Sequence, residues 1–358
     1  MNLGGSEIQS DLIAKGLTNL GHDVTYAAVT KSKLYEGIQV PYTLVPLDVT
    51  HEASLVDILK HWKPDVVYWR YNKRYFYRSA KIIRKNKIPL VFAISSIDDV
   101  TRFASRPRFS KGIFGECKNI LSRARQSIVS CWNYMGFRYV DGVTSLNNDY
   151  LKNIHVNHKK SINNAMHFER GDFRWGKPYC LWVANIRAQK RPEKFIELAE
   201  IINERGHNID FIMIGRLDHK VFEGVIRNAE LSLPNFHYIG PIEPTDVNDA
   251  LAKSIALVHT CEPEGFGNIF IQAWFASCPT LTLEFDPEGL IMRHKTGFVS
   301  GSTSRMASDL ESLILSDELR QQMGAAGKVL AESKFTTERM VQEVDVFLTD
   351  VVSHYSSK

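Results

Sequence analysis

Few features of this sequence favour export, a disulfide framework or a zinc site. The 358 residues include only five cysteines, an odd number without any C-x-x-C pair: Cys117, Cys131, Cys180, Cys261 and Cys278. Scattered thiols of this kind are typical of a protein kept in reducing surroundings. No apolar run approaches the roughly 20 residues of a membrane-spanning helix, and the chain opens without a signal-peptide pattern. We therefore expect a cytoplasmic protein.

The sequence also lacks a large excess of charge of either sign. Lys and Arg number 44 and Asp and Glu number 40, which gives a formal net charge of +4. Proteins that bind nucleic acid concentrate a stronger basic excess on one face, so we expect no nucleic-acid partner. No segment has the low hydrophobicity and high net charge of a disordered region, and the length suffices for two globular domains.

Strand-like and helix-compatible segments alternate along most of the chain, which predicts parallel α/β sheets. Strand-like runs in the first half cover 23–29, 43–49, 65–70, 89–95 and 142–146. After the aperiodic segment 161–178, a second series begins at residue 179. We expect an N-terminal domain over 1–168, a C-terminal domain over 169–335, and a last helix over 336–358 that packs back towards the first domain. Two such sheets in succession predict a ligand cleft between the domains.

The stretch 258–278 has the strongest functional pattern. An apolar strand-like run is followed by Gly265 and Gly267, which permit a tight turn. Asn268 is a good N-cap for a helix beginning at residue 269. Free N–H groups and the helix dipole then predict an anion site. Glu264 before the turn and Gln272 on the helix can bracket a polyhydroxylated ligand.

The segment 102–138 is rich in basic and aromatic residues. It contains eight basic residues and one acidic residue, Glu116, with six aromatic residues interleaved. One interpretation is a surface that binds an anionic membrane. The other is a solvated helix face whose aromatic residues lie in the core.

Four motifs in order resemble those of family 4 of the retaining glycosyltransferases with the GT-B fold. They are Gly4-Gly5-Ser-Glu7, Asn164-Ala165-Met166, the segment 183–192 with Lys190, and the run from Glu264 to Gln272. The resemblance extends over nearly the whole chain. It implies two Rossmann-like domains that face each other across a cleft, with the acceptor on the first and a nucleotide sugar on the second.

The implied activity is transfer of a sugar from a nucleotide-diphosphate sugar to an acceptor hydroxyl, with retention, in cell-surface glycan or glycolipid synthesis. The family implies no cofactor besides this co-substrate. No D-x-D pair of the kind that holds a donor-bound metal is present, so we expect a metal-independent reaction. The expected partners are a nucleotide sugar and a sugar or lipid-linked acceptor, with a place at the inner face of the membrane if 102–138 binds anionic lipid.

The resemblance assigns roles to individual residues. Lys190 contacts the donor diphosphate, and Glu264 holds the hexose hydroxyls; we expect these two to be catalytic. Gln272 stands where the family has a glutamate that grips the ribose. The full set of expected donor-binding residues is Gly4, Gly5, Asn185, Arg187, Lys190, Phe266, Gly267, Asn268 and Gln272.

Three departures from the family pattern leave other functions open. Asn185 replaces an arginine, so one phosphate-binding charge is missing unless Arg187 or Arg191 supplies it. Ser95 and Ser96, our candidates on the acceptor side, stand where many members have a histidine. The first strand of the N-domain is missing before Gly4, although it is central in a 3-2-1-4-5 sheet. The alternatives are a GT-B epimerase or phosphorylase, and a non-catalytic relative.

Overall fold

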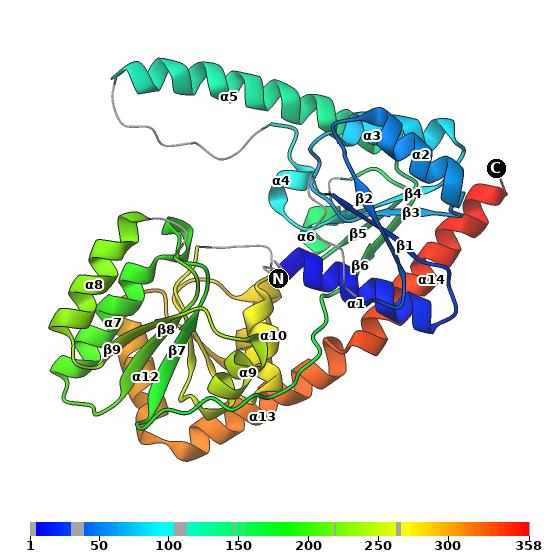
Figure 1. Ribbon diagram of the computed structural model, residues 1–358. Coiled ribbons are helices and arrows are strands. Elements are labelled where there is room, and N and C mark those ends of the chain that lie inside the picture. The colour runs from blue at the N-terminus through cyan, green and yellow to red at the C-terminus, as the bar shows by residue number, and fades with distance from the viewer. Residues whose placement is uncertain are drawn as a thin grey trace. The chain divides into compact units, whose positions relative to one another are not determined.

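The chain folds into two compact units. The computed structural model describes residues 5–29, 39–103, 113–146, 148–152, 154–217, 220–262 and 266–357 (Figure 1). One unit comprises Met1–Asn164 with Thr337–Lys358, and the other comprises Ala165–Thr336. The sequence analysis expected the domain boundaries after residues 168 and 335, whereas the two units divide after residues 164 and 336. The C-terminal segment belongs to the same unit as the N-terminal half of the chain.

The N-terminal unit contains two parallel sheets. One pairs β1 (Thr25–Val29) with β2 (Thr43–Leu47), and the other has the order β3 (Val67–Trp69), β4 (Leu90–Ile94), β5 (Gly142–Ser145), β6 (His158–Ser161). Its helices are α1 (Gly5–Asn19), α2 (Glu52–Trp62), α3 (Phe76–Lys85), α4 (Ile97–Val100), α5 (Ile113–Tyr134), η1 (Met135–Tyr139), α6 (Asn148–Leu151) and α14 (Thr337–Ser356).

The two sheets share one hydrophobic core. Leu47 of β2 belongs to the same buried cluster as Trp69 of β3 and Phe92 of β4, and Ala27 and Val29 of β1 pack against that cluster. Among the described residues, β1 pairs with β2 alone and β3 with β4 alone. The missing strand itself stays a prediction.

Burial explains which strands of this unit were predictable. All five residues of β4 are buried, and its apolar run is typical of a parallel strand covered on both faces. Strand β6 was not predicted, because it is a polar edge strand that begins with His158, Lys159 and Lys160.

The C-terminal unit is built on one six-stranded parallel sheet. Its order is β12 (Gly297–Val299), β11 (Thr280–Thr282), β10 (Leu257–His259), β7 (Tyr179–Val183), β8 (Asp210–Ile214), β9 (Phe236–Gly240). The helices are η2 (Ala188–Lys190), α7 (Pro192–Glu204), η3 (Lys220–Phe222), α8 (Glu223–Ser232), α9 (Pro244–Lys253), α10 (Asn268–Phe275), η4 (Pro287–Gly289), α11 (Leu290–His294), α12 (Thr303–Leu315) and α13 (Asp317–Lys334). The predicted α/β class with two parallel-sheet units is confirmed.

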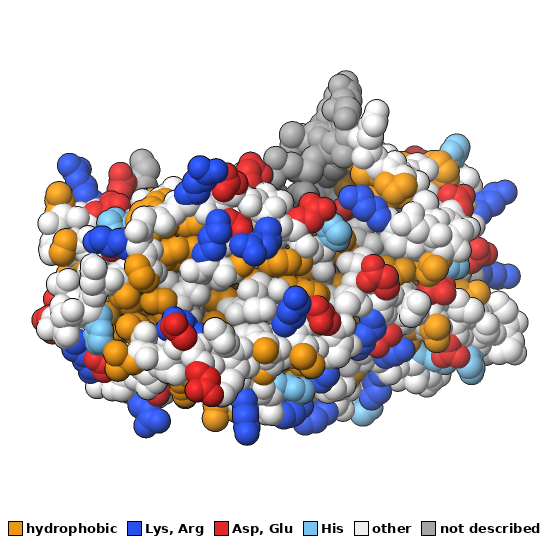
Figure 2. All heavy atoms as spheres, turned by 90° about the horizontal axis from the view of Figure 1, so that it is seen from below, with side chains coloured by type: hydrophobic (Ala, Val, Ile, Leu, Met, Phe, Trp, Pro, Cys, Tyr) orange, Lys and Arg blue, Asp and Glu red, His pale blue; other side chains and the backbone are white. Residues whose placement is uncertain are grey.

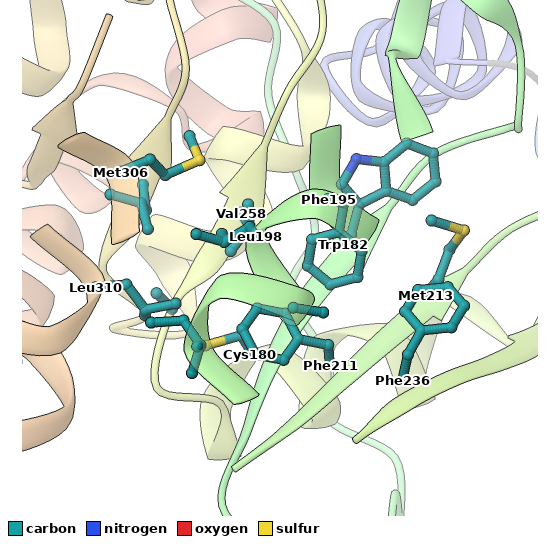
Figure 3. Close-up of a cluster of buried hydrophobic side chains, with 14 of the residues drawn as sticks. Cys180, Trp182, Phe195, Leu198, Phe211, Met213, Phe236, Val258, Met306 and Leu310 are labelled. Carbon is teal, nitrogen blue, oxygen red and sulfur yellow. The ribbon is translucent and has the colours of Figure 1, made fainter. Parts of the chain in front are cut away.

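Two buried clusters hold this sheet in place. In the first, shown in Figure 3, Phe195 of α7 lies 5.4 Å from Phe211 and 6.2 Å from Phe236, measured between ring centroids. In the second, the ring of Trp274 of α10 is tilted against that of Phe335, with the centroids 5.5 Å apart. The helices that carry site residues are therefore fixed by aromatic packing.

Helix α13 approaches the end of α10 closely because it carries a glycine at the contact. A Cβ on Gly324 would lie 2.2 Å from the backbone oxygen of Ser277, which directly follows α10. Backbone atoms cannot rotate away as a side chain can. Gly324 is therefore needed for the position of α10.

The surface is mixed in charge. On the face seen in Figure 2, Lys and Arg side chains are interspersed with Asp and Glu. None of the helices described by the structure is long and apolar enough to cross a membrane.

We predict that Gly324→Ala lowers the free energy of unfolding by about 1–3 kcal/mol, because it overpacks a contact with backbone. The matched control is Gly224→Ala in α8, where a Cβ meets nothing within 4 Å. That change is expected to stabilise by about 0.4–1 kcal/mol. Denaturant unfolding of both variants measures the two effects. Equal stabilisation by both would contradict the close approach of α13 to Ser277.

Candidate functional site

The candidate site lies at the carboxyl edge of the C-terminal sheet, where the strand order reverses. The chain passes from β7 to β8 and β9 on one side and then returns to β10 on the other side of β7. Ligands of open α/β sheets bind at such a switch point. The loop after β7 (184–191) and the described residues after β10 (260–262, 266 and 267) are therefore the segments in which a site is expected.

Hydrogen bonds tie these two loops together. The Thr260 hydroxyl, fully buried, lies 2.8 Å from the Lys190 carbonyl oxygen and 3.0 Å from that of Arg191, and it accepts from Trp182 Nε1 at 2.9 Å. The backbone N–H of Glu262 donates to the Gln189 oxygen at 3.0 Å. Thr260 and Trp182 were not among the predicted residues, although Thr260 follows β10 directly. They fix the backbone from which Lys190 extends.

Lys190 itself ends the short helix η2, and its side chain is half-buried. Its neighbour Arg191 has a left-handed backbone conformation, with φ of 47°. The Arg191 guanidinium donates to the backbone carbonyl oxygen of Thr260 at 2.7 Å and forms an ion pair with the Glu284 carboxylate at 3.4 Å. Arg191 therefore ties the loop after β7 to the residue that follows β10.

Asn185 and Arg187 are exposed on either side of a buried residue, Ile186. The Ile186 N–H donates to the Arg216 oxygen at 2.8 Å. Gly215, with φ of 142°, allows the approach, because a Cβ there would lie 1.8 Å from the Ala184 oxygen. Both predicted side chains thus project from a rigid loop.

The start of α10 differs from the prediction. Gly267, with φ of 81°, is the N-cap, and Asn268 is the first helical residue. The prediction of Asn268 as N-cap is therefore wrong by one residue, because glycine reaches this positive φ without a steric penalty. No side-chain hydrogen bond caps the helix among the described residues. The first N–H groups of α10 remain suited to an anion.

Phe266 anchors the end of this loop. Its ring is buried and lies 5.4 Å from Phe335 and 6.3 Å from Trp274. Only its backbone can therefore serve a ligand. Gly4, Glu264 and Gly265 lie outside the described residues, whereas Gly5 is the first residue of α1.

Gln272 belongs to a chain of amides. Its Nε2 donates to Asn248 Oδ1 at 2.9 Å, and Asn248 Nδ2 donates to the Glu169 backbone oxygen at 2.8 Å. Asn248, which is buried, was not predicted. The bond to Asn248 uses the nitrogen of the Gln272 amide, so its oxygen is the atom that can accept from a hydroxyl.

In the N-terminal unit, Ser95 and Ser96 surround the buried carboxylate of Asp99. Asp99 Oδ2 accepts from Ser95 N, Ser95 Oγ and Ser96 N at 3.0 Å each, and from Ser96 Oγ at 3.4 Å. Burial raises the pKa of Asp99, while the bonds from the serines and the Lys73 charge oppose that rise. Sequence reasoning missed Asp99, although Ser96-x-x-Asp99 has the spacing of a capping box. Both serine hydroxyls can still accept from a ligand.

Comparison with known proteins finds a family likeness in the C-terminal unit. Residues 165–329 match the family model for glycosyl transferases group 1. The capsular polysaccharide biosynthesis glycosyltransferase CapM of Staphylococcus aureus is 25% identical over 171 residues, which is 46% of this chain and 44% of CapM. The match thus spans less than half the length of that relative.

Solved structures match over both units. HepE from Anabaena, in complex with UDP, has a TM-score of 0.75 at 14% identity, covering 97% of this chain and 96% of HepE. WaaG, a glycosyltransferase involved in lipopolysaccharide biosynthesis, has a TM-score of 0.66 at 16% identity, covering 97% of both chains. At such identities the likeness shows the fold, which is GT-B. Over residues 165–329 the chain is similar to the glycosyl transferases group 1 family.

Proposed function

We propose that this protein is a retaining glycosyltransferase that moves a sugar from a nucleotide-diphosphate sugar to an acceptor hydroxyl. The observation that carries the proposal is the joining of the loops after β7 and β10 through Thr260 at the switch point of the sheet. This arrangement places the half-buried Lys190 and the N-terminus of α10 on neighbouring loops. A cation and a helix N-terminus together suit a diphosphate.

The donor binds the C-terminal unit. Lys190 and the first N–H groups of α10 stabilise the charge that develops on the leaving diphosphate, with Arg187 as the second cation. Gln272 accepts from the ribose through its amide oxygen. Glu264, from the loop before α10, holds the sugar hydroxyls. A uracil base is supported by the UDP complex of the similarly folded HepE.

The reaction proceeds by front-face attack, and the leaving diphosphate helps to take the acceptor proton. The protein contributes position and electrostatic stabilisation rather than a covalent step, and the reaction needs no metal ion. The acceptor binds the N-terminal unit, where Ser95 and Ser96 offer hydroxyls oriented by Asp99. A role in cell-surface glycan or glycolipid synthesis is supported by the names of CapM and WaaG.

A membrane surface is the proposed location of the acceptor. Part of 102–138 is in the core, because Phe137 lies 4.9 Å from Phe92. On α5, however, Ile128 is 68% exposed and Trp132 is 52% exposed, one turn apart, with Arg125 on the same face. Exposed apolar residues beside a basic residue suit a peripheral contact with anionic lipid. The core interpretation therefore holds for Phe137, and the membrane interpretation stays a proposal for the exposed face of α5.

The proposal predicts that UDP-glucose raises the melting temperature of the wild-type protein. It also predicts turnover with an added acceptor, reduced at least about 100-fold in Glu264→Ala because the sugar is no longer positioned. Product analysis separates transfer from epimerisation, since an epimerase returns an isomerised nucleotide sugar. Equal background rates in the wild type and Glu264→Ala would identify a non-catalytic relative.

Lys190→Met is expected to lower kcat by about 10²–10³, the cost of removing one group that stabilises developing negative charge. The matched control is Lys194→Met on α7, which removes a partly exposed pair with Glu197 and is expected to leave kcat nearly unchanged. Release of UDP from UDP-glucose measures both. Similar losses in the two variants would argue against a diphosphate contact by Lys190.

We further predict that the protein floats with vesicles containing an anionic phospholipid and not with neutral vesicles. Ile128→Glu should abolish flotation, because it places a charge on the apolar face of α5. Leu231→Glu on α8, at a residue 79% exposed, is the matched control. The lipid contact is wrong if the wild type fails to float, or if both variants float equally.

A further inference from the structure

Three side chains of the N-terminal unit with metal-ligating chemistry meet away from every residue assigned above. His158 stands on β6, and Asp350 and His354 stand on α14. One candidate ligand atom from each lies within 4.8 Å of the other two. His158 Nδ1 is 3.0 Å from Asp350 Oδ2, and His354 Nδ1 is 3.3 Å from Asp350 Oδ1.

Packing in the core brings the two elements together. Gly142 of β5 is the register partner of His158. A Cβ on Gly142 would lie 2.8 Å from Val351 Cγ2, so the residue after Asp350 rests directly on the strand beside β6. Asp350 and His354 are four residues apart on a helix, which places them on the same face. The convergence therefore follows from the buried contact and not only from mobile surface side chains.

We propose that His158, Asp350 and His354 form a site for a zinc-type divalent cation that joins α14 to β6. Two imidazoles and one carboxylate form a donor set that zinc prefers, whereas magnesium and calcium prefer oxygen alone. At zinc bond lengths near 2.0–2.1 Å, tetrahedral ligand atoms lie about 3.3 Å apart. Each imidazole lies near that distance from a different oxygen of Asp350, Oδ2 for His158 and Oδ1 for His354, so the carboxylate stands between the two rings. His354 Nδ1 also lies 3.0 Å from the Asp350 backbone oxygen, a contact that a bound cation would replace.

Another residue of α14, Asp345, pairs with a single histidine and serves for comparison. His22 Nε2 lies 2.7 Å from Asp345 Oδ1. In the proposed site a second imidazole is added, and the rings of His158 and His354 meet edge to face with centroids 4.7 Å apart. A cation bound between the three groups bridges the C-terminal helix to the edge strand, so its binding is coupled to the stability of the N-terminal unit.

The test uses the full chain without a polyhistidine tag, treated with EDTA and then dialysed. Zn²⁺ is expected to bind with a stoichiometry of one in calorimetry and to raise the melting temperature, while Mg²⁺ leaves it unchanged. His354→Gln, at a side chain 60% exposed, is expected to weaken Zn²⁺ binding at least about tenfold, since even groups outside the ligand set change metal affinity by about 10–100-fold.

The matched control is His22→Gln, which removes a histidine paired with the same helix and is expected to retain the Zn²⁺ effect. The double variant His158→Gln/His354→Gln is expected to lose it. Retention of the Zn²⁺ shift in the double variant would overturn the site, as would a wild-type melting temperature that does not respond to Zn²⁺. Neither result bears on sugar transfer, because no residue of the proposed donor site is changed.

Discussion

The buried hydroxyl of Thr260 is the contact on which the candidate site depends. Parallel strands of this fold are joined through helices, so the loops at their carboxyl ends belong to segments far apart in the chain. Thr260 joins two of them, because it contacts the carbonyl oxygens of Lys190 and Arg191 and accepts from Trp182. The Arg191 guanidinium in turn donates a hydrogen bond to the backbone carbonyl oxygen of Thr260. The hydroxyl of Thr260 and the indole N–H of Trp182 are buried and hydrogen-bonded, which holds the two loops in one arrangement. The Lys190 side chain therefore extends from a backbone that does not need to reorganise on binding.

Much of the fold was predictable because strands that are buried on both faces have continuous apolar sequences. Strands β4, β7 and β8 are apolar runs, and each is covered on both faces, so their composition indicates their place. The edge strand β6 has no such mark, since His158, Lys159 and Lys160 are polar and only pairing with β5 makes them a strand. The predicted start of α10 was wrong by one residue, for a local reason. Asn268 has the side chain of an N-cap, but the glycine before it takes the backbone conformation of the cap.

The candidate site was only partly predictable. Lys190, Phe266 and Gln272 could be identified from a resemblance along the chain, because they lie within continuous motifs. Thr260 and Asn248 could not, since each acts through a partner distant in sequence, whereas the capping-box spacing of Ser96 and Asp99 is a local signal that was missed. Thr260 is 70 residues from Lys190, and Asn248 is 24 residues from Gln272. Nothing in a lone threonine or asparagine indicates that its hydrogen-bonding groups will be buried beside a particular neighbour.

Asn248 also explains why Gln272 can stand where the family has a glutamate that grips the ribose. A backbone carbonyl can only accept, so the contact with the Glu169 oxygen requires the nitrogen of the Asn248 amide. The oxygen of that amide must then face Gln272, which in turn must present its own nitrogen. A carboxylate at position 272 has no hydrogen to donate and would set two acceptors against each other. The glutamine is therefore the residue that the neighbouring asparagine requires, and its oxygen is oriented by that bond. The substitution lowers the charge of the candidate ribose contact and keeps its geometry.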